Sequence, residues 1–236
     1  QVHEVAFSAC GTLMVSAANE SAILVCDVAT GKVRSTLRNH PAKTVACSPD
    51  GRTIASGGDD HVVWLWDAAT GKEVQALTGH TDVIASLVCF SPEKNSTRLA
   101  SASNDFSVRV WDSSSGQCVC VLDGEAAVTC VAFSPDGATL ASGGEDKVVR
   151  LLDVANKVER VAARHQGSVR CICFSPDGRR VYSAGDDSTV RAWNGRSGVE
   201  LLVLQGPPAG VTRLVVSEDG AMLVGAGARG EPVCWD

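Results

Sequence analysis

The chain has 236 residues, of which 44% are hydrophobic and 20% are charged, as in a folded protein rather than a disordered one. Its net charge of −6 gives no reason to expect nucleic acid as a partner. No apolar run reaches the roughly 20 residues that a membrane-spanning helix needs, and the N-terminus has no signal-peptide pattern.

One motif recurs six times along the chain, and a fixed period of this size indicates a repeat architecture. Each copy places two short apolar segments around a polar turn and ends in Trp-Asp or a variant of it, about 40 to 45 residues after the previous copy. A Ser-Pro-Asp-Gly turn and a Gly-His pair, or degraded forms of them, recur in the same phase. The copies are Ser16–Asp27, Ser56–Asp67, Ser101–Asp112, Ser142–Asp153, Ser183–Asn194 and Gly225–Asp236.

Each repeat predicts four short strands. In the second repeat they are Thr44–Ser48, Thr53–Gly57, Val62–Asp67 and Glu73–Gly79. These segments alternate in polarity and are separated by Gly, Asp, Ser and Pro, whereas no segment has a helical period. A single four-stranded sheet has two faces to bury, and stacking neighbouring sheets buries both. We predict an all-β chain with repeats at about 1–40, 41–80, 81–124, 125–165, 166–206 and 207–236.

The motif resembles that of the WD-repeat (WD40) β-propeller family. Gly79-His80, Ser101, Asp105 and Trp111-Asp112 match the family pattern in full, and the resemblance covers about the whole chain. It implies a propeller of six visible units and 23 strands, because the last unit ends after its third strand. Since an unsealed ring would expose a strand edge, we expect an excerpt of a longer protein with a seven-bladed or longer array. The alternatives are a six-bladed ring without one outer strand and a piece that straddles two propellers.

The resemblance also implies a structural network in each regular unit. A His before the first strand, a Ser on the second, an Asp in the following turn and a Trp on the third strand form a hydrogen-bonded chain. A Ser, His and Asp together can also indicate a hydrolase, but a nucleophile has no reason to recur three times, so we expect no enzyme and no cofactor. The expected sets are His40–Ser56–Asp60–Trp66, His80–Ser101–Asp105–Trp111 and His165–Ser183–Asp187–Trp193.

Partner binding is expected at the turns between the second and third strands. In the family these turns gather on one face, and the residue before the turn Asp points towards it. Those residues are mostly acidic, which favours a basic peptide; the alternative is that they are solvated turn residues. The candidates are Asn19, Asp59, Asn104, Glu145 and Asp186, with Asp82 from a preceding loop and Lys43 as a counterweight.

Trp64 is a further candidate for partner binding. It occupies the slot that holds Arg109, Arg150 and Arg191 in other repeats, and we expect these arginines to pair with the acidic turns. An exposed aromatic there could be a binding hot spot, whereas the alternative is packing against the neighbouring blade.

The ten cysteines mostly occupy strand positions, and no Cys-x-x-Cys occurs. We expect reduced thiols packed in the core, with a metal or redox role as the alternative. This usage indicates a reducing compartment, the cytoplasm first and the nucleus second.

The function expected from the sequence is a non-catalytic scaffold that binds other proteins, with neither membrane nor nucleic acid as a partner. The alternatives are a structural part of a cytoskeletal, centriolar or ciliary assembly, and a reader of basic peptide tails.

Overall fold

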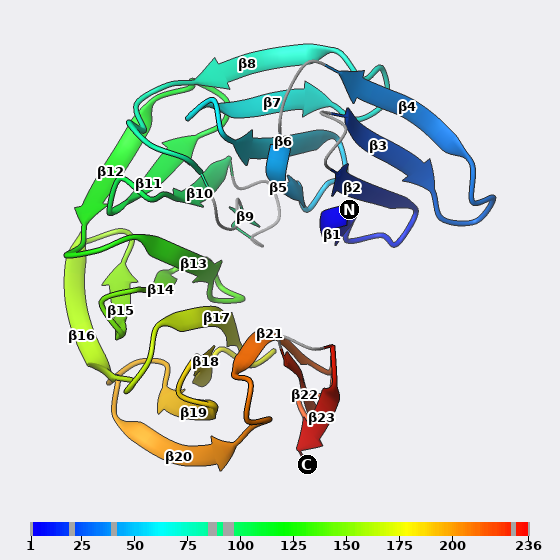
Figure 1. The fold of residues 1–236 in the computed structure, drawn as a ribbon. Helices are drawn as coiled ribbons and strands as arrows, with labels where there is room; N and C mark the ends of the chain where they lie inside the picture. The colour runs from blue at the N-terminus through cyan, green and yellow to red at the C-terminus, as the bar shows by residue number, and fades with distance from the viewer. Residues whose placement is uncertain are drawn as a thin grey trace. The chain divides into compact units, whose positions relative to one another are not determined.

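The computed structural model describes residues 2–18, 22–38, 42–84, 89–91, 97–227 and 230–235, without the side chains of Arg38, Cys89 and 160–163. Over these residues every regular element is a β-strand, which confirms the all-β prediction (Figure 1). The described strands number 23, in six antiparallel sheets that correspond to the six repeats. No helix able to cross a membrane occurs in the described part of the chain. The chain divides into two compact units, Gln1–Asp123 and Gly124–Asp236.

The first unit contains three blades, each with its strands in the order of the sequence. The third blade begins with a short described strand, and residues 92–96 lie outside the described residues. The strands are β1 (Val2–Phe7), β2 (Leu13–Ala18), β3 (Ala22–Asp27), β4 (Val33–Arg38), β5 (Ala42–Cys47), β6 (Thr53–Gly58), β7 (Val63–Asp67), β8 (Glu73–Leu77), β9 (Cys89–Phe90), β10 (Arg98–Ala102), β11 (Ser107–Asp112) and β12 (Cys118–Asp123).

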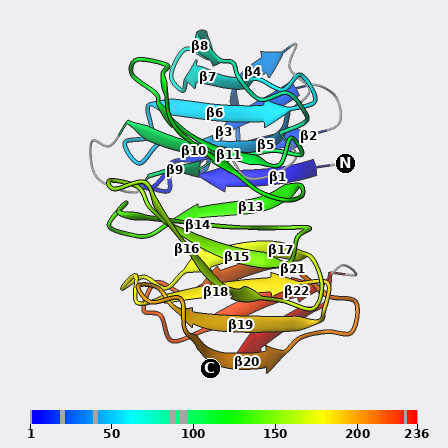
Figure 2. The same ribbon diagram turned by 90° about the vertical axis from the view of Figure 1, so that its left-hand side faces the viewer.

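The second unit contains two four-stranded blades and one described sheet of three strands. The strand order within each sheet, for example β17-β18-β19-β20, can be followed in the turned view of Figure 2. The strands are β13 (Val128–Phe133), β14 (Thr139–Gly144), β15 (Val148–Asp153), β16 (Val158–Arg164), β17 (Val169–Phe174), β18 (Arg180–Gly185), β19 (Thr189–Asn194), β20 (Glu200–Gln205), β21 (Val211–Val216), β22 (Leu223–Gly227) and β23 (Pro232–Trp235).

The Ser-Pro-Asp-Gly turns fix the first hairpin of the regular blades. Between β5 and β6, the Ser48 amide donates to the Thr53 carbonyl at 2.8 Å, and the Asp50 carboxylate accepts from the Ser48 hydroxyl and the Arg52 amide. Gly51 follows with φ of +69°, a left-handed conformation that glycine adopts without a steric penalty. The turn therefore sets the register in which Val45 pairs with Ser56.

Stacking of consecutive blades buries both faces of the inner sheets. In the first unit, Val15 and Ile23 of blade 1 pack with Val45, Ile54 and Trp66 of blade 2. In the second unit, residues of blade 5 such as Ala184 and Val190 pack with Val211, Leu214 and Leu223 of blade 6. Because these faces are occupied, side chains that can meet a partner lie on the turns and on the outer strands.

Candidate functional site

The most regular hydrogen-bond network lies in blade 3. His80 Nδ1 is 2.7 Å from Asp105 Oδ2, and its Nε2 is 2.8 Å from Ser101 Oγ, which also accepts the Trp111 Nε1–H at 2.8 Å. The Thr81 amide donates to the same carboxylate at 3.0 Å. The loop before the first strand is thereby joined to the second and third strands of its own blade.

Blade 5 repeats this network. His165 Nδ1 lies 3.0 Å from Asp187 Oδ2 and its Nε2 lies 2.7 Å from Ser183 Oγ, which accepts from Trp193 Nε1 at 2.7 Å. The Gln166 amide donates to Asp187 at 2.8 Å.

Blade 2 has a partial network in the described residues. Trp66 Nε1 donates to Ser56 Oγ at 2.8 Å, as in the other two sets. Asp60 accepts from Trp64 Nε1 at 2.8 Å, whereas the fourth expected member, His40, lies outside the described residues.

Burial and hydrogen bonding set opposite charge states for the two titratable members of the network. Burial lowers the pKa of His80 and of His165 below the ordinary 6.5, and the neighbouring carboxylate opposes this only in part. Burial raises the pKa of Asp105 and Asp187, but hydrogen bonds outweigh it and bring both to about 2. At neutral pH an ionised Asp therefore accepts from Nδ1–H of a neutral His, whose Nε2 accepts from the Ser hydroxyl.

Acidification is expected to destabilise the protein in two stages. When the pKa of a group is lower in the folded state than in the unfolded state, the unfolded chain binds the proton first as the pH falls. The contribution of that group to stability is therefore fully present above its unfolded-state pKa and is lost as the pH drops below that value. Because of the two histidines, the free energy of unfolding is expected to fall first as the pH drops through 6.5. Because of the two aspartates, it is expected to fall again between pH 3.8 and about 2. Urea midpoints measured from pH 8 downwards, at roughly one-unit steps, test this. His80→Gln with His165→Gln should flatten the first stage, and a midpoint that is constant from about pH 7 to 5 would contradict the assignment.

The geometry of His, Ser and Asp matches that of a hydrolytic triad, but the nucleophile position is closed. Ser101 and Ser183 are 0% exposed, and each hydroxyl oxygen also receives an indole N–H. A substrate carbonyl cannot approach either oxygen unless the blade opens. The arrangement is suited to holding a loop against a blade.

The predicted partner residues of the first unit are assembled by the loop before β9. The Ile84 amide donates to the Gly58 carbonyl at 3.0 Å, and the Asn104 amide donates to the Val83 carbonyl at 3.0 Å. The Ser103 hydroxyl donates to the Asp82 carbonyl at 3.0 Å. Asp82 therefore lies beside the turn that carries Asn104, and the same loop reaches the blade that carries Asp59. Asn19 lies outside the described residues.

Two of the predicted acidic residues already form salt bridges with basic side chains. Lys43 Nζ lies 2.5 Å from Asp59 Oδ1, and Arg170 donates to both oxygens of Asp186 at 2.6 to 3.0 Å. The Asp186 hydrogen bond and its charge raise the pKa of Arg170, and the charge of Glu145 adds to this. Lys43 and Arg170 occupy the same position, the second residue of the first strand of their blades. The sequence analysis expected Lys43 as a counterweight to the acidic residues but did not identify Arg170.

Trp64 is half-buried on β7. Its indole packs against the core between blades 1 and 2 and lies 6.1 Å from the Trp66 ring. Its N–H donates to Asp60. These contacts agree with the packing alternative, and the residue as a whole remains partly exposed.

Phe106 is a surface residue that the sequence did not indicate. It lies in the same turn as Asn104, is 48% exposed and has φ of +71°. A left-handed conformation costs a non-glycine residue roughly 1–2 kcal/mol. His61, Lys147 and Ser188 occupy the same turn position and also have positive φ. Aligning the six repeats by their turns could therefore have identified Phe106 as an aromatic residue at this position.

The cysteines differ in their exposure. Core packing is confirmed for Cys26, Cys130 and Cys171, but it is wrong for Cys10, Cys118 and Cys234, which are exposed because they lie in a turn or on outer strands. Cys10 occupies the turn position that is Asp50 in blade 2, and hydrogen bonds from Ser8 and Thr12 lower the pKa of its thiol to about 7.

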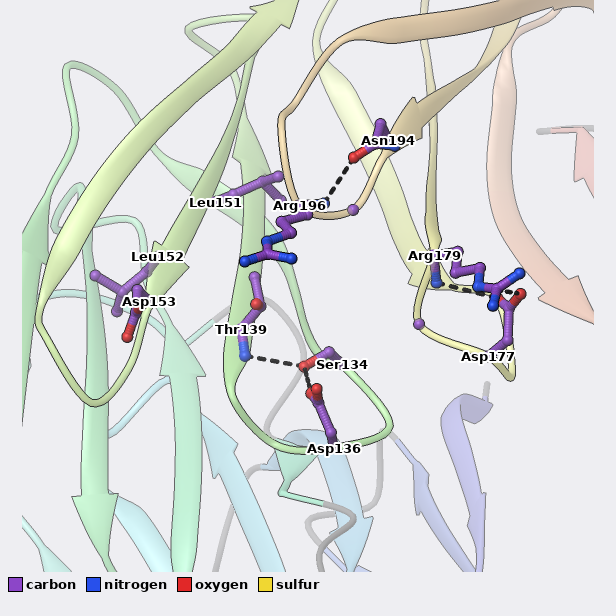
Figure 3. Close-up of a pocket in the computed structure, with 12 residues that line it drawn as sticks. Ser134, Asp136, Thr139, Leu151, Leu152, Asp153, Asp177, Arg179, Asn194 and Arg196 are labelled. Atoms are coloured by element: carbon purple, nitrogen blue, oxygen red, sulfur yellow. Dashed lines mark hydrogen bonds and ion pairs between the residues drawn. The ribbon is translucent and has the colours of Figure 1, made fainter.

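A pocket of about 620 Å³ lies within the second unit, between blades 4 and 5 (Figure 3). Its lining includes Asp136, Asp177, Arg179 and Arg196. Asp136 and Asp177 each accept hydrogen bonds from their own turns, which lower the pKa of both carboxyl groups. These carboxylates therefore serve to close the turns. Within the described residues, no group of three or more His, Cys, Asp or Glu side chains is placed to hold a metal ion.

Comparison with known proteins agrees with this architecture. The family model described as the IFT122 first beta-propeller matches residues 1–236. The small ribosomal subunit protein RACK1z of Arabidopsis thaliana is 42% identical over 83 residues, which cover 34% of this chain and 24% of that protein. The nuclear distribution protein PAC1 of Coccidioides posadasii is 30% identical over 147 residues, covering 54% of this chain and 31% of that protein. The chain thus spans less than a third of the length of these two relatives. Its six repeated sheets, its buried His–Ser–Trp networks and the match over its whole length show that the chain belongs to the IFT122 first beta-propeller family of WD-repeat β-propellers.

Proposed function

We propose that the protein is a non-catalytic scaffold that presents rigid turns to partner proteins. Support comes from the buried networks, which hold the loops before β9 and β17 against their blades. The Ser–His–Asp set, which the sequence raised as a hydrolase pattern, is enclosed in blades 3 and 5. The relative RACK1z is named as a protein of the small ribosomal subunit, and this favours an interaction role.

The observation that carries the proposal is the surface formed by Asp82, Asn104 and Phe106 in the first unit. An exposed aromatic ring and an exposed carboxylate on hydrogen-bonded turns provide an anchor and a charge. The positive φ of Phe106 is set by the turn, since His61, Lys147 and Ser188 share it. A partner segment with an apolar side chain next to a Lys or Arg fits this surface.

The ion pairs at Asp59 and Asp186 change the expectation of a broadly acidic face. Lys43 and Arg170 offset two of its charges, so the attraction for a long basic tail is weaker than the sequence suggests. We therefore favour binding of a partner at a local surface around Phe106 over binding of a long basic peptide tail.

Capture of partners by the full-length protein tests the proposal. Phe106→Gly combined with Asp82→Lys is expected to weaken binding of the main partners about tenfold or more. Phe106→Gly alone should leave the thermal midpoint unchanged or raise it, because glycine relieves the positive φ. Glu73→Lys, an exposed charge change on β8, is the matched control. An unchanged set of partners in the double variant would contradict the proposal and direct attention to the blade edges.

The family membership supports a second proposal, that the scaffold works in a cytoplasmic or ciliary assembly. Fluorescence imaging of the full-length protein in ciliated cells tests it. Enrichment at the cilium or its base is expected, and a uniform distribution through the cytoplasm would contradict it.

A further inference from the structure

An arrangement of charges that recurs on blades 4 and 5 identifies an unusual site on blade 3. On blade 4, Arg150 Nε lies 3.0 Å from Glu159 Oε1, and its Nη1 lies 2.5 Å from Asp146. On blade 5, Arg191 Nη1 lies 2.7 Å from Glu200 Oε2. In both blades the Glu lies near the start of the outer strand, opposite the last apolar residue of the third strand.

Blade 3 keeps the arginine and replaces the glutamate by a thiol. Arg109 is the counterpart of Arg150, and Cys118 pairs with Trp111 in the register where Glu200 pairs with Trp193. The Cys118 sulfur lies 4.0 Å from Arg109 Nη1, at the outer limit of a hydrogen bond to sulfur. Asp105, the counterpart of Asp146, is bound instead by His80, Thr81 and Ser107.

The guanidinium of Arg109 is held in place although it lacks an anion. Its Nε is buried and has no hydrogen-bond partner within the described residues, whereas the same atom of Arg150 bonds to a carboxylate. The group lies over the Trp111 ring at 5.9 Å, and a Cβ on Gly79 would come within 2.9 Å of its Nη1. On blade 5 the corresponding Nη1 of Arg191 pairs with Glu200, so an anion at the position of the Cys118 sulfur, beside Nη1 of Arg109, would be stabilised by a charge-assisted hydrogen bond.

We propose that Cys118 is a thiol-modification site at which oxidation to the sulfinate supplies the anion that Arg109 lacks. Cys118 is exposed and can meet a hydroperoxide from solvent. The sulfur attacks one peroxide oxygen, an S–O bond forms, the O–O bond breaks and water leaves, which gives the sulfenic acid. A second peroxide oxidises the sulfenic acid in the same way, with loss of water and a proton, to a sulfinate. Its two oxygens on one centre resemble a carboxylate, and they can accept from Nη1–H of Arg109, as Glu200 accepts from Nη1–H of Arg191 on blade 5.

The remaining exposed thiols lack this partner. Cys10 forms hydrogen bonds with the Ser8 and Thr12 hydroxyls in its own turn, and Cys234 lies on β23. Blade 2 has the reverse replacement, with Glu73 retained and Trp64 in the arginine slot. Oxidation at Cys118 therefore has a specific structural consequence, which is a more stable outer strand on blade 3.

The test uses the full-length protein with Cys10→Ser and Cys234→Ser, treated with hydrogen peroxide and followed by peptide mass spectrometry and thermal unfolding. Gain of two oxygen atoms at Cys118 should raise Tm by about 2–4 °C. Adding Cys118→Ser should abolish the rise. Adding Arg109→Gln should leave oxidation possible but remove the rise, which separates charge pairing from a merely structural effect.

An untreated pair of variants provides a second measurement. Cys118→Glu restores the carboxylate of blades 4 and 5 and should raise Tm relative to Cys118→Gln, by a margin that Arg109→Gln eliminates. Equal Tm values for the two variants would overturn the proposed anion position. Oxidised Cys118 without a change in Tm, a disulfide between Cys118 and Cys120, or an unmodified Cys118 while other thiols oxidise would each overturn the proposed modification.

Discussion

Replacing Trp111 with alanine is expected to lower the free energy of unfolding by about 3–5 kcal/mol. The side chain is 1% exposed, lies in the core between blades 2 and 3, and donates its only N–H to Ser101. The substitution removes this packing and also takes one partner from the hydroxyl that His80 contacts. Urea unfolding followed by circular dichroism measures the loss.

Trp64→Ala is the matched control for Trp111→Ala. Both residues are tryptophans on the third strand of a blade, but Trp64 is half-buried and bonds to an exposed turn carboxylate. Its replacement should cost clearly less. If Trp111→Ala unfolds at the same urea concentration as the parent, the network does not stabilise the blade as inferred.

A methyl group at Gly144 is expected to cost about 2–4 kcal/mol, because it would overpack backbone and disturb a hydrogen bond. A Cβ there would lie 2.2 Å from the Ala127 carbonyl oxygen and 3.0 Å from Val128 Cα. That carbonyl accepts from the Glu145 amide at 2.9 Å, so moving it away also disrupts the turn. Thermal or urea unfolding of Gly144→Ala checks the prediction.

Gly11→Ala is the control for this clash. A Cβ at Gly11 meets nothing within 4 Å, but the residue has φ of +67°. Its cost should therefore be the conformational penalty alone, about 1–2 kcal/mol. If Gly144→Ala costs no more than Gly11→Ala, the contact with Ala127 is easily relaxed.

The sequence predicted the architecture well because the signals repeat in a fixed phase. The strand predicted at Thr53–Gly57 is observed as β6 at Thr53–Gly58, and the strand predicted at Val62–Asp67 is observed as β7 at Val63–Asp67. The residues of the His80 and His165 sets lie within hydrogen-bond distance, since spacing along one blade fixes their register.

Features that depend on neighbouring strands were harder to predict. The pairing of Arg170 with Asp186 joins β17 to the turn after β18, and alternation along one strand does not show which opposite charge it meets. Alternation also fails to separate inner from outer strands, which is why Cys118 was expected in the core and is exposed. The positive φ of Phe106 depends on the turn type and leaves no mark in the composition.

The side-chain bonds between consecutive blades have a consequence for how the protein folds. Glu4 accepts from the Val45 amide, the Thr129 hydroxyl donates to the Val169 carbonyl, and Cys171 accepts from the Leu214 amide. Each of these bonds spans 40 to 43 residues, about one repeat. Closing such a loop has nearly the same entropic cost wherever it occurs in the chain. Folding can therefore begin at whichever pair of neighbouring blades forms first and then spread one blade at a time, as in a linear array of coupled units.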